Sequence, residues 1–538
     1  MAKHYDGIGE LLVDLLTAHD VNTVFGIPGV HTIALYRGLA ASNIRHITPR
    51  HEQGAGFMAD GYARATGKPG VCLCITGPGM TNIITAMGQA FADSIPMLVI
   101  SSVNKTSTLG LGLGQLHELT DQQKLVSTVA AFSHTLMSLD DLPAIITRAF
   151  AVFSTARPRP VHIEIPVDLL DQKIQLATPV YKTQFSKPGP DPVIVEKMAS
   201  LIAEKQRKVL LVGGGCVDAA DELQAFVELT GMPTCLTINA RGLLPTNHPL
   251  LLDGVQTINV FRDYIDASDL VIGVGTELGE TDYDFYGTGP LATQGKLLRI
   301  DIDPQQAAAN SDSICFLQAD AGAALVALTA QLKQHHSLVG NDSATDDVQR
   351  INTALKQQCT APTQQYDDLL AAILNALPEA IIVGDSTKPI YHANFVFRAA
   401  APRRWFNSAT GYGTLGYAMP AAIGAKIGMP DTPVVAIAGD GGFQFTLNEL
   451  VTATQEQTPI AVVVWNNHGY KEIGDCMTNA GISPVGVNVT GPNLELLANA
   501  MHARYARALT INDIENALTH LHSDSTPLVV EYVTDIDA

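Results

Sequence analysis

The chain has 538 residues, of which 46% are hydrophobic and 16% are charged, and its formal net charge is −20. This length suffices for about three domains, each burying its own core, and the composition is typical of a well-packed α/β enzyme rather than a disordered protein. The negative charge argues against nucleic acid and anionic membranes as partners.

The first 20 residues lack a continuous apolar core and a cleavage site, so we expect an amphipathic helix rather than a signal peptide. No apolar run approaches the roughly 20 residues that a membrane helix needs. The seven cysteines are scattered, mostly in apolar strands. Cys72 and Cys74 point to one face of a predicted strand, but no second pair completes a metal site. We therefore expect a cytoplasmic protein with buried, structural thiols.

The first third of the chain alternates regularly between helical and strand patterns, which predicts a doubly wound parallel sheet. The predicted helices are 6–19, 31–40, 51–66 and 79–91, and the predicted strands are 23–25, 44–48, 70–76, 97–101 and 160–165. The last of these strands is expected to complete the sheet. A proline-rich stretch at 186–192 then indicates a linker.

The rest of the chain repeats this pattern twice. Strands are predicted at 209–212, 269–274 and 297–302, and then at 380–384, 433–438, 460–465 and 527–532. Polar, helix-poor sequence at 335–348 marks the boundary between the two sets. The predicted fold class is α/β, with three doubly wound parallel-sheet domains at residues 1–182, 193–335 (Rossmann-like) and 360–538.

Residues 433–467 contain the strongest functional pattern. An apolar strand ends in Gly439-Asp440-Gly441-Gly442, a helical stretch follows, and the next apolar strand ends in Asn466-Asn467. In a parallel α/β sheet, the carboxyl ends of the strands are where ligands bind. The glycines let backbone N–H groups approach an anion, and Asp440 and Asn467 supply the oxygen ligands that Mg²⁺ prefers. The residues alone therefore predict a magnesium-diphosphate site.

This GDG…NN arrangement resembles the signature of thiamine-diphosphate enzymes. The resemblance implies that Asp440 and Asn467 are two metal ligands, that the backbone carbonyl of Gly469 is a third, and that thiamine diphosphate and Mg²⁺ are the cofactors. The bland alternative is an ordinary turn followed by a helix cap.

A second stretch, PRHEQGAGFMADGYAR at 49–64, carries Glu52 just after an apolar strand, at a predicted helix start where a carboxylate is favoured. Alone, such a glutamate is usually a first-turn helix acid. The stretch resembles the pyrimidine-binding domain of thiamine-diphosphate enzymes of the acetolactate synthase group. That resemblance implies that Glu52 hydrogen-bonds the aminopyrimidine ring and helps to activate the cofactor. It also implies a homodimer at minimum, because two subunits share each cofactor, and we expect a homotetramer.

Further loops at strand ends match cofactor-binding positions of this family, although each alone would be a plain turn or a core residue. Leu415 matches the bulky residue that wedges under the bent cofactor. The other expected cofactor contacts are Gly26, Pro28, Gly77, Gly384, Asp385, Ser386 and Gly413, together with the glycines Gly439, Gly441 and Gly442.

Two histidines are candidate catalytic residues. His117 lies in the loop GQLHELTDQQ. The corresponding loop of acetolactate synthases has a sequence like FQE, with the glutamine at the position of His117. Several decarboxylases of the family place proton-transferring histidines in this loop. A solvated loop histidine is the equally simple alternative. His468 directly follows Asn467 and could also face the cofactor.

The stretch GTELGETDYDFYG places Glu277 where acetolactate synthases carry an arginine that binds a second 2-oxo acid, and no tryptophan follows Asn467. An added acid would repel a second carboxylate, so non-oxidative decarboxylation of a 2-oxo acid to an aldehyde and CO₂ fits better than carboligation. This stretch and NNHGYKEI resemble the 5-guanidino-2-oxopentanoate (2-ketoarginine) decarboxylases. Glu277, Asp282 and Asp284 could pair with such a cationic tail, or they could form a solvated acidic loop.

Three alternatives stay open at this stage. The nearest is acetolactate synthesis by carboligation. A flavin-dependent oxidase would hold FAD in the middle domain, although Gly213-Gly214-Gly215 lacks the third glycine of the G-x-G-x-x-G pattern. The last is a non-catalytic paralogue, against which the presence of Glu52, Asp440 and Asn467 argues.

Overall fold

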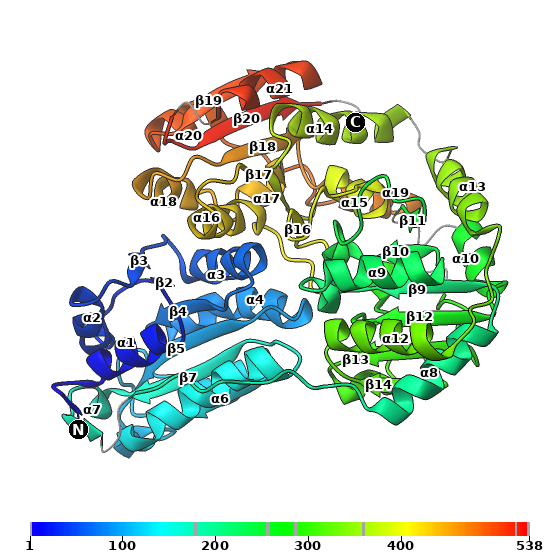
Figure 1. Cartoon of the computed structure of the whole chain (residues 1–538). Helices are drawn as coiled ribbons and strands as arrows, with labels where there is room; N and C mark the ends of the chain where they lie inside the picture. Colours follow the sequence, from blue (N-terminus) through cyan, green and yellow to red (C-terminus); the bar gives the residue numbers. More distant parts are fainter. Residues whose placement is uncertain are drawn as a thin grey trace. The chain divides into compact units, whose positions relative to one another are not determined.

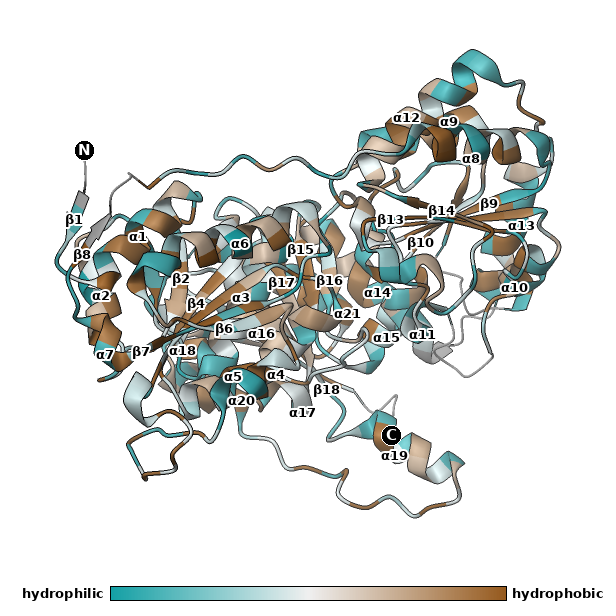
Figure 2. Ribbon diagram, turned by 90° about the horizontal axis from the view of Figure 1, so that it is seen from below, coloured by the Kyte–Doolittle hydropathy of each residue, from teal (hydrophilic) through white to brown (hydrophobic). Residues whose placement is uncertain are grey.

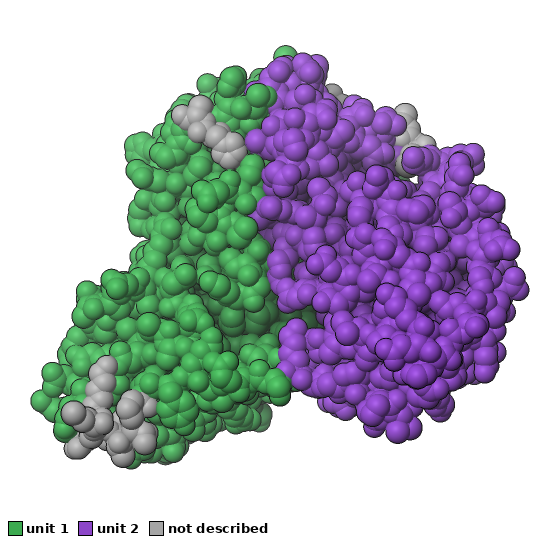
Figure 3. Space-filling model, viewed as in Figure 1, with its two compact units in different colours: residues 1–186, 412–509, 517–534 green, residues 187–411, 510–516, 535–538 purple. Residues whose placement is uncertain are grey.

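The computed structural model describes residues 3–176, 180–253, 259–283, 289–357, 361–521 and 524–534 (Figure 1). Its contacts divide the chain into two compact units, coloured in Figure 3. Unit 1 comprises residues 1–186, 412–509 and 517–534, and unit 2 comprises residues 187–411, 510–516 and 535–538. The three domain boundaries expected from the sequence stay a prediction.

Within the described residues, three sheets of six parallel strands confirm the predicted fold class. The N-terminal sheet has the order β3-β2-β4-β5-β7-β6. Its strands are β2 (Thr23–Gly26), β3 (Arg45–Ile47), β4 (Gly70–Cys74), β5 (Met97–Val103), β6 (Phe132–Thr135) and β7 (Val161–Pro166). Its helices are α1 (Ile8–Ala18), α2 (Ile33–Ala40), α3 (Glu52–Thr66), α4 (Pro78–Ala92), α5 (Gln122–Ser127), α6 (Leu142–Thr155) and α7 (Val167–Leu170).

The two faces of this sheet bury different sets of side chains, because alternate residues of a strand point to opposite faces. Leu73, Ile100 and Ile163 pack with α1, α2 and α6 in one apolar cluster. On the opposite face Cys72 lies against α3, where its Sγ is 3.5 Å from the carbonyl oxygen of Ala55. The strands of this sheet are mostly hydrophobic, as their brown colour in Figure 2 shows, which is expected for a parallel sheet that is buried on both faces.

The central sheet, in unit 2, has the order β11-β10-β9-β12-β13-β14. Its strands are β9 (Lys208–Val212), β10 (Thr234–Leu236), β11 (Leu251–Leu252), β12 (Leu270–Val274), β13 (Leu297–Asp301) and β14 (Cys315–Gln318). Helices α8 (Pro192–Glu204), α9 (Ala220–Thr230) and α12 (Ala321–His335) pack on one face. Helices α10 (Asn259–Asp266) and α13 (Ala344–Gln357) pack on the other.

The C-terminal sheet has the order β16-β15-β17-β18-β20-β19. Its strands are β15 (Ile381–Gly384), β16 (Trp405–Asn407), β17 (Val434–Gly439), β18 (Ala461–Asn466), β19 (Arg504–Ala508) and β20 (Leu528–Val533). The helices of this part are α14 (Ala361–Ala376), α15 (Lys388–Val396), α16 (Ala418–Gly428), α17 (Asp440–Phe443), α18 (Glu449–Gln455), α19 (Lys471–Asn479), α20 (Leu494–Ala500) and α21 (Ile511–Thr519).

Several short elements depart from the sequence prediction. The strand at 160–165 is not the edge of its sheet, because β6 pairs along its outer side. A small antiparallel pair, β1 (Lys3–Tyr5) with β8 (Ile174–Leu176), was not predicted. The helix-free segment between α12 and α13 is shorter than the stretch expected at 335–348, because α12 ends at His335 and α13 begins at Ala344. Strands β1, β6 and β8 were missed because they are only three or four residues long and, in the case of β6, half-buried, so their sequences lack a clear apolar pattern.

Among the described residues, no helix is long and apolar enough to cross a membrane, and the cytoplasmic location stays a prediction. The expectation of buried thiols holds for Cys72, Cys74, Cys216, Cys235 and Cys315. It is wrong for Cys476, which is exposed on α19, and Cys359 lies outside the described residues.

Helices α3 and α16 cross at a point where both backbones come into direct contact. A Cβ placed on Gly61 would lie 2.0 Å from the carbonyl oxygen of Ala421, and one on Gly424 would lie 1.9 Å from that of Met58. Glycine is therefore required at the crossing for steric reasons, although it is a poor helix former. This crossing fixes the helix that begins with Glu52 against the C-terminal part of unit 1.

The crossing yields a stability prediction. Gly61→Ala would raise the intrinsic helix propensity, yet we expect the melting temperature to fall by about 5 °C or more, because the added methyl group overpacks two backbones. Thermal unfolding followed by circular dichroism would measure the change. Gly189→Ala is the control, because a Cβ there meets no atom within 4 Å. An unchanged or higher melting temperature for Gly61→Ala would contradict the close crossing.

Candidate active site

Asp440 and Asn466 lie side by side at the carboxyl ends of two paired strands. Strands β17 and β18 are parallel, and the last aligned pair is Gly439 with Trp465. The next residue along each strand is therefore Asp440 on one and Asn466 on the other. The βαβ unit expected from the sequence is confirmed, but α17 is a single helical turn, and α18 begins only at Glu449.

The Asp440 carboxylate is nearly buried, at 7% exposure, and its Oδ1 has no hydrogen-bond partner among the described residues. Burial raises the pKa of Asp440, while the backbone amide of Asn467 opposes that shift. An unpartnered buried carboxylate oxygen is unfavourable by itself. A cation placed there would relieve that cost and would favour the ionised form.

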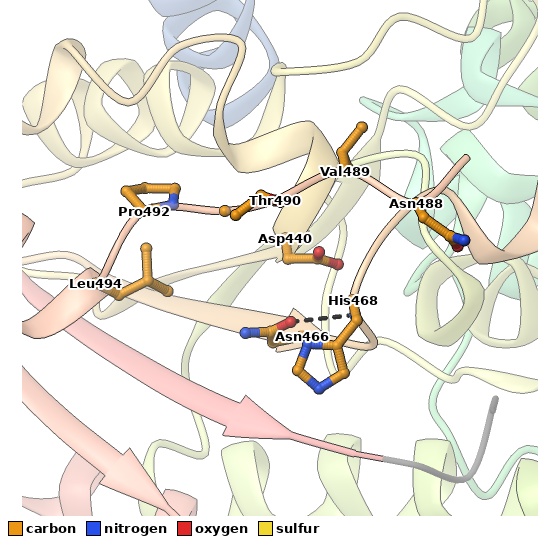
Figure 4. A pocket seen from close by; sticks show the side chains of 9 residues that line it. Asp440, Asn466, His468, Asn488, Val489, Thr490, Pro492 and Leu494 are labelled. Carbon is orange, nitrogen blue, oxygen red and sulfur yellow. Dashed lines mark hydrogen bonds between the residues drawn. The ribbon is translucent and has the colours of Figure 1, made fainter. Parts of the chain in front are cut away.

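Asn467 and Gly469 lie in the turn that follows β18. The turn is tight, because His468 and Gly469 have positive φ angles of 65° and 146°. The backbone N–H of His468 donates to Asn466 Oδ1 at 3.2 Å, as Figure 4 shows. A side chain at Gly469 would collide with the carbonyl oxygen of Val487, 2.2 Å from the added Cβ. Glycine is thus required at position 469 because the segment that contains Val487 packs directly against this turn.

A cavity of about 490 Å³ opens beside these groups (Figure 4). It is lined by Asp440, Asn466, His468, Asn488, Val489, Thr490, Gly491, Pro492 and Leu494. The wall formed by residues 488–494 was not predicted, and its only sequence signal is the Gly491-Pro492 loop before α20. His468 is exposed and lines this cavity, and its catalytic role stays a prediction.

Glu52 is the first residue of α3 and is 8% exposed. The helix start is capped by His51, whose ring nitrogen accepts from the backbone N–H of Gln53. Asn82, on α4, donates from Nδ2 to Glu52 Oε2 at 2.9 Å. This contact was not predicted, and it orients the carboxylate so that Oε1 stays available to a ligand.

The expected loop contact Gly77 is held by Gln122, which the sequence analysis also missed. Gln122 Oε1 accepts from the Gly77 backbone N–H at 3.0 Å and from the Thr76 hydroxyl at 2.9 Å. Its Nε2 donates to Glu164 Oε2 at 2.9 Å. Gly77 has φ +70°, and a side chain there would meet the carbonyl oxygen of His117 at 2.6 Å. Gln122 therefore fixes the loops of Gly77 and His117 together.

Leu415 is half-buried in a segment attached to α4. Thr414 donates to Gln89 Oε1 through its backbone N–H, at 3.2 Å, and its hydroxyl, at 2.9 Å. Gln89 in turn donates to Asp93. Gly413 has φ +73° and an open Cβ position, so the segment turns sharply just before Leu415.

Five other expected cofactor contacts lie in different environments. Gly26 lies where a Cβ would be 2.2 Å from the carbonyl oxygen of Leu73, so this glycine serves sheet packing. Pro28 is exposed. In unit 2, Gly384 packs against Ile390, Asp385 is 1% exposed, and the Ser386 hydroxyl lies 3.3 Å from that of Ser408.

The acidic loop of unit 2 is only partly described. Glu277 is exposed, and its backbone carbonyl accepts from Asn310. Asp282 Oδ1 accepts from the Ile238 backbone N–H at 3.2 Å, which gives this acid a structural partner. Asp284 lies outside the described residues. The substrate roles of these three acids stay predictions.

The donor set near Asp440 fits Mg²⁺. Asp440 supplies a buried, unpartnered carboxylate oxygen, and the expected ligands Asn467 and Gly469, in the turn after β18, would add an amide and a carbonyl oxygen. The ligand roles of Asn467 and Gly469 stay predictions. No group of three or more His, Cys, Asp or Glu side chains in the described part of the chain could hold a metal. A magnesium site that uses an amide and a carbonyl does not require such a group. Gly441 and Gly442 are buried, and a Cβ on Gly441 would lie 2.5 Å from the Tyr470 ring, so this glycine lets α17 pack against Tyr470.

Comparison with known proteins agrees with this geometry. Models of the thiamine pyrophosphate enzyme family match the chain over residues 7–125 (N-terminal TPP binding domain), 195–328 (central domain) and 383–532 (C-terminal TPP binding domain). The chain is 42% identical to a Pseudomonas aeruginosa protein named "Probable 2-ketoarginine decarboxylase", over 95% of this chain and 91% of that protein.

Acetolactate synthases are also similar. The chain is 32% identical to acetolactate synthase 2, chloroplastic, of Nicotiana tabacum, over 85% of this chain and 70% of the relative. It is 34% identical to the acetolactate synthase of Mycobacterium leprae, over 83% of this chain and 73% of the relative.

The Asp440 environment leads to a binding prediction. In Asp440→Asn we expect the Mg²⁺-dependent affinity for thiamine diphosphate to fall at least about 100-fold, because a charged metal ligand is lost. Quenching of tryptophan fluorescence would report binding, since Trp465 is buried directly beside Gly439 and the chain has only two tryptophans. Asp431→Asn, an exposed site before the start of β17, is the matched control. Equal affinities for both variants would remove Asp440 from the site.

Proposed function

The chain belongs to the thiamine pyrophosphate enzyme family, and we propose that it is a non-oxidative decarboxylase that converts a 2-oxo acid with a guanidino tail into an aldehyde and CO₂, with thiamine diphosphate and Mg²⁺ as cofactors. The observation that carries the proposal is the buried, unpartnered Oδ1 of Asp440 beside Asn467, in a chain 42% identical to a protein named as such a decarboxylase. When bound, thiamine diphosphate supplies a carbanion that adds to the 2-oxo group and accepts the electrons released with CO₂.

Different residues of the chain have different proposed roles. Asp440, Asn467 and the Gly469 carbonyl would hold the metal, and Gly441 and Gly442 would let the diphosphate approach the backbone. Glu52 would hydrogen-bond the aminopyrimidine through Oε1, because Asn82 already engages Oε2. Leu415 would support the bent cofactor. His117 and His468 are the proposed proton donors and acceptors.

Decarboxylation is favoured over carboligation by residue chemistry. Carboligation needs a site for a second carboxylate, and the position of the synthase arginine carries the exposed acid Glu277 instead. The identity to the acetolactate synthases, 31–34%, keeps carboligation as the second candidate.

The geometry gives no support to a flavin site at the glycine-rich turn of the central domain. The backbone N–H of Gly213 donates to Val274, and that of Gly215 donates to Gly275. A Cβ at Gly213 would lie 2.2 Å from the carbonyl oxygen of Gly275. These glycines therefore serve backbone packing, and their amides are not available to cradle a phosphate.

We also propose that two subunits share each cofactor, and that the assembly is at least a homodimer, with a homotetramer expected. In unit 1, exposed apolar side chains occur both near the His117 loop and near the Asp440 cavity, the two regions that would each supply half of a shared site. Val30, Leu111 and Leu113 are 60–63% exposed on the loops near His117. Phe445 and Val485, 51% and 74% exposed, lie on the segments that flank the Asp440 cavity in sequence. Apolar surface of this kind beside a polar site is typical of a protein interface.

The proposed substrate can be tested with a matched pair of 2-oxo acids. With thiamine diphosphate and Mg²⁺, we expect kcat/KM for 5-guanidino-2-oxopentanoate to exceed that for neutral 5-ureido-2-oxopentanoate by about 100-fold, since a charge-assisted pair recognises the guanidinium. Aldehyde and CO₂ would be measured separately from acetolactate, with pyruvate and branched-chain and aromatic acids in the panel. Acetolactate from pyruvate as the main product would overturn decarboxylation.

In the same assay Glu277→Gln should reduce the guanidino preference, whereas Glu280→Gln, an exposed acid at the start of α11 (Glu280–Tyr283), should not. Equal preference in the wild type and Glu277→Gln would remove Glu277 from recognition of the tail.

Shared sites predict complementation between inactive variants. Glu52→Gln and Asp440→Asn should each lose nearly all activity, because each damages one half of every site. After the two proteins are mixed and allowed to exchange subunits, about half of the dimers are mixed, and each has one intact site out of two. Activity should therefore recover to about a quarter of the wild-type value. No recovery, with subunit exchange confirmed by native mass spectrometry, would argue that each subunit binds its cofactor alone.

A further inference from the structure

His31 and His117 form a pair at the carboxyl edge of the N-terminal sheet. Their rings meet edge-to-face, with centroids 5.4 Å apart and an angle of 78° between the ring planes. His31 follows β2, whereas His117 lies in the loop between β5 and α5. Glu52 follows β3, and Gly77 follows β4, so all four positions lie at the carboxyl ends of strands in one parallel sheet.

The backbone on each side of the pair is fixed. Thr32 is fully buried, and its hydroxyl lies 3.0 Å from both the N–H and the carbonyl oxygen of Gly29. The His117 residue has φ +61°, and its carbonyl accepts from the Thr76 hydroxyl at 3.4 Å. The backbone that carries each imidazole is therefore held by hydrogen bonds within its own loop or to a neighbouring one.

Each ring has a buried nitrogen that makes no hydrogen bond. Nδ1 of His31 and Nδ1 of His117 both lack a partner among the described residues. A buried, unsatisfied nitrogen costs about 1–3 kcal/mol, and here two such nitrogens belong to rings whose centroids are 5.4 Å apart. They are expected where a site awaits a substrate or a proton.

The nearby acids are turned to other partners. Glu118, next to His117, accepts from the backbone N–H groups of Leu113 and Gln115. Glu52 accepts from Asn82. Burial, followed by the charge of His117, lowers the pKa of His31. A charge on His117 therefore disfavours a second positive charge on His31.

We propose that His31 is a second proton-transfer residue of this active site, and that it works with His117 as a pair that delivers one proton per turnover to the carbon from which CO₂ has left. The proposal rests on the decarboxylase function above. Loss of CO₂ from a 2-oxo acid anion consumes one proton when the aldehyde forms. An imidazolium N–H bond breaks, a C–H bond forms, and the neutral pair regains a proton from water.

The first test uses the protein without substrate. Histidine Cε1–H resonances would be titrated by NMR in the wild type and in His31→Asn, His117→Asn and His134→Asn. Removal of His117 should raise the pKa of His31, because a like charge is lost. His134→Asn is the matched control, because burial also lowers the pKa of His134 but its neighbour is Arg148. A pKa of His31 that is unchanged in His117→Asn would contradict the coupling of the two histidines.

The second test follows product partition. With ferricyanide as electron acceptor, the carbon left by CO₂ loss is either protonated to the aldehyde or oxidised to the acid. His31→Asn should lower kcat for aldehyde at least about 10-fold, with KM within about twofold, and should raise the ratio of acid to aldehyde. The double variant should be no slower than the slower single variant, because the pair acts as a unit.

An unchanged product ratio in His31→Asn would overturn the proton-transfer role, even if kcat fell. The affinity for thiamine diphosphate, measured by tryptophan quenching, should stay at the wild-type value in every variant. If the wild type decarboxylated no 2-oxo acid at all, the proposed function would fail. The NMR titration would still decide whether the two histidines are coupled.

Discussion

The arrangement of unit 1 depends on a buried charge cluster that joins α3, α4 and the segment at 412–417. Arg64 donates to Asp60 Oδ1 at 2.6 Å and to Asp93 Oδ2 at 2.5 Å, and its side chain is only 4% exposed. Burial disfavours the Arg64 charge, yet the carboxylates of Asp60 and Asp93 raise the pKa of Arg64. Tyr417 donates to Asp60, which brings the third element into the cluster. Loss of one member would leave a buried charge uncompensated, a cost of about 3–5 kcal/mol.

This cluster matters for function because of what its elements carry. Helix α3 begins with Glu52, α4 presents Asn82, and the 412–417 segment contains Leu415. If two subunits share each cofactor, as proposed, Glu52 and Leu415 of one chain serve different cofactors of the same dimer. The Asp60–Arg64–Asp93 cluster then fixes the geometry between the two sites, and the glycine crossing of α3 and α16 holds the same two parts from the other direction.

The sequence was most informative where chemistry and local structure coincide. Apolar runs predicted β17 and β18, and a polar residue at the end of each run placed Asp440 beside the Asn466-Asn467 pair. The same logic located Glu52 at a helix start. It could not find Asn82, Gln122 or His31, because their roles depend on contacts between segments 30–86 residues apart. Nor could it show that Gly26 serves packing against Leu73, since a glycine at a strand end looks the same in both roles.

The segments around His117 differ in how well they would tolerate substitution. Gly77 and Gln122 are tied to buried groups, so most substitutions there would disturb Glu164 and the strand ends. The preceding stretch, residues 109–116, has exposed leucines and glycines whose Cβ positions are open, and Glu118 holds it mainly through backbone amides. The exposed leucines of this stretch can therefore vary at little cost in stability, whereas the positive φ angles of Gly110, Gly112 and Gly114 favour glycine.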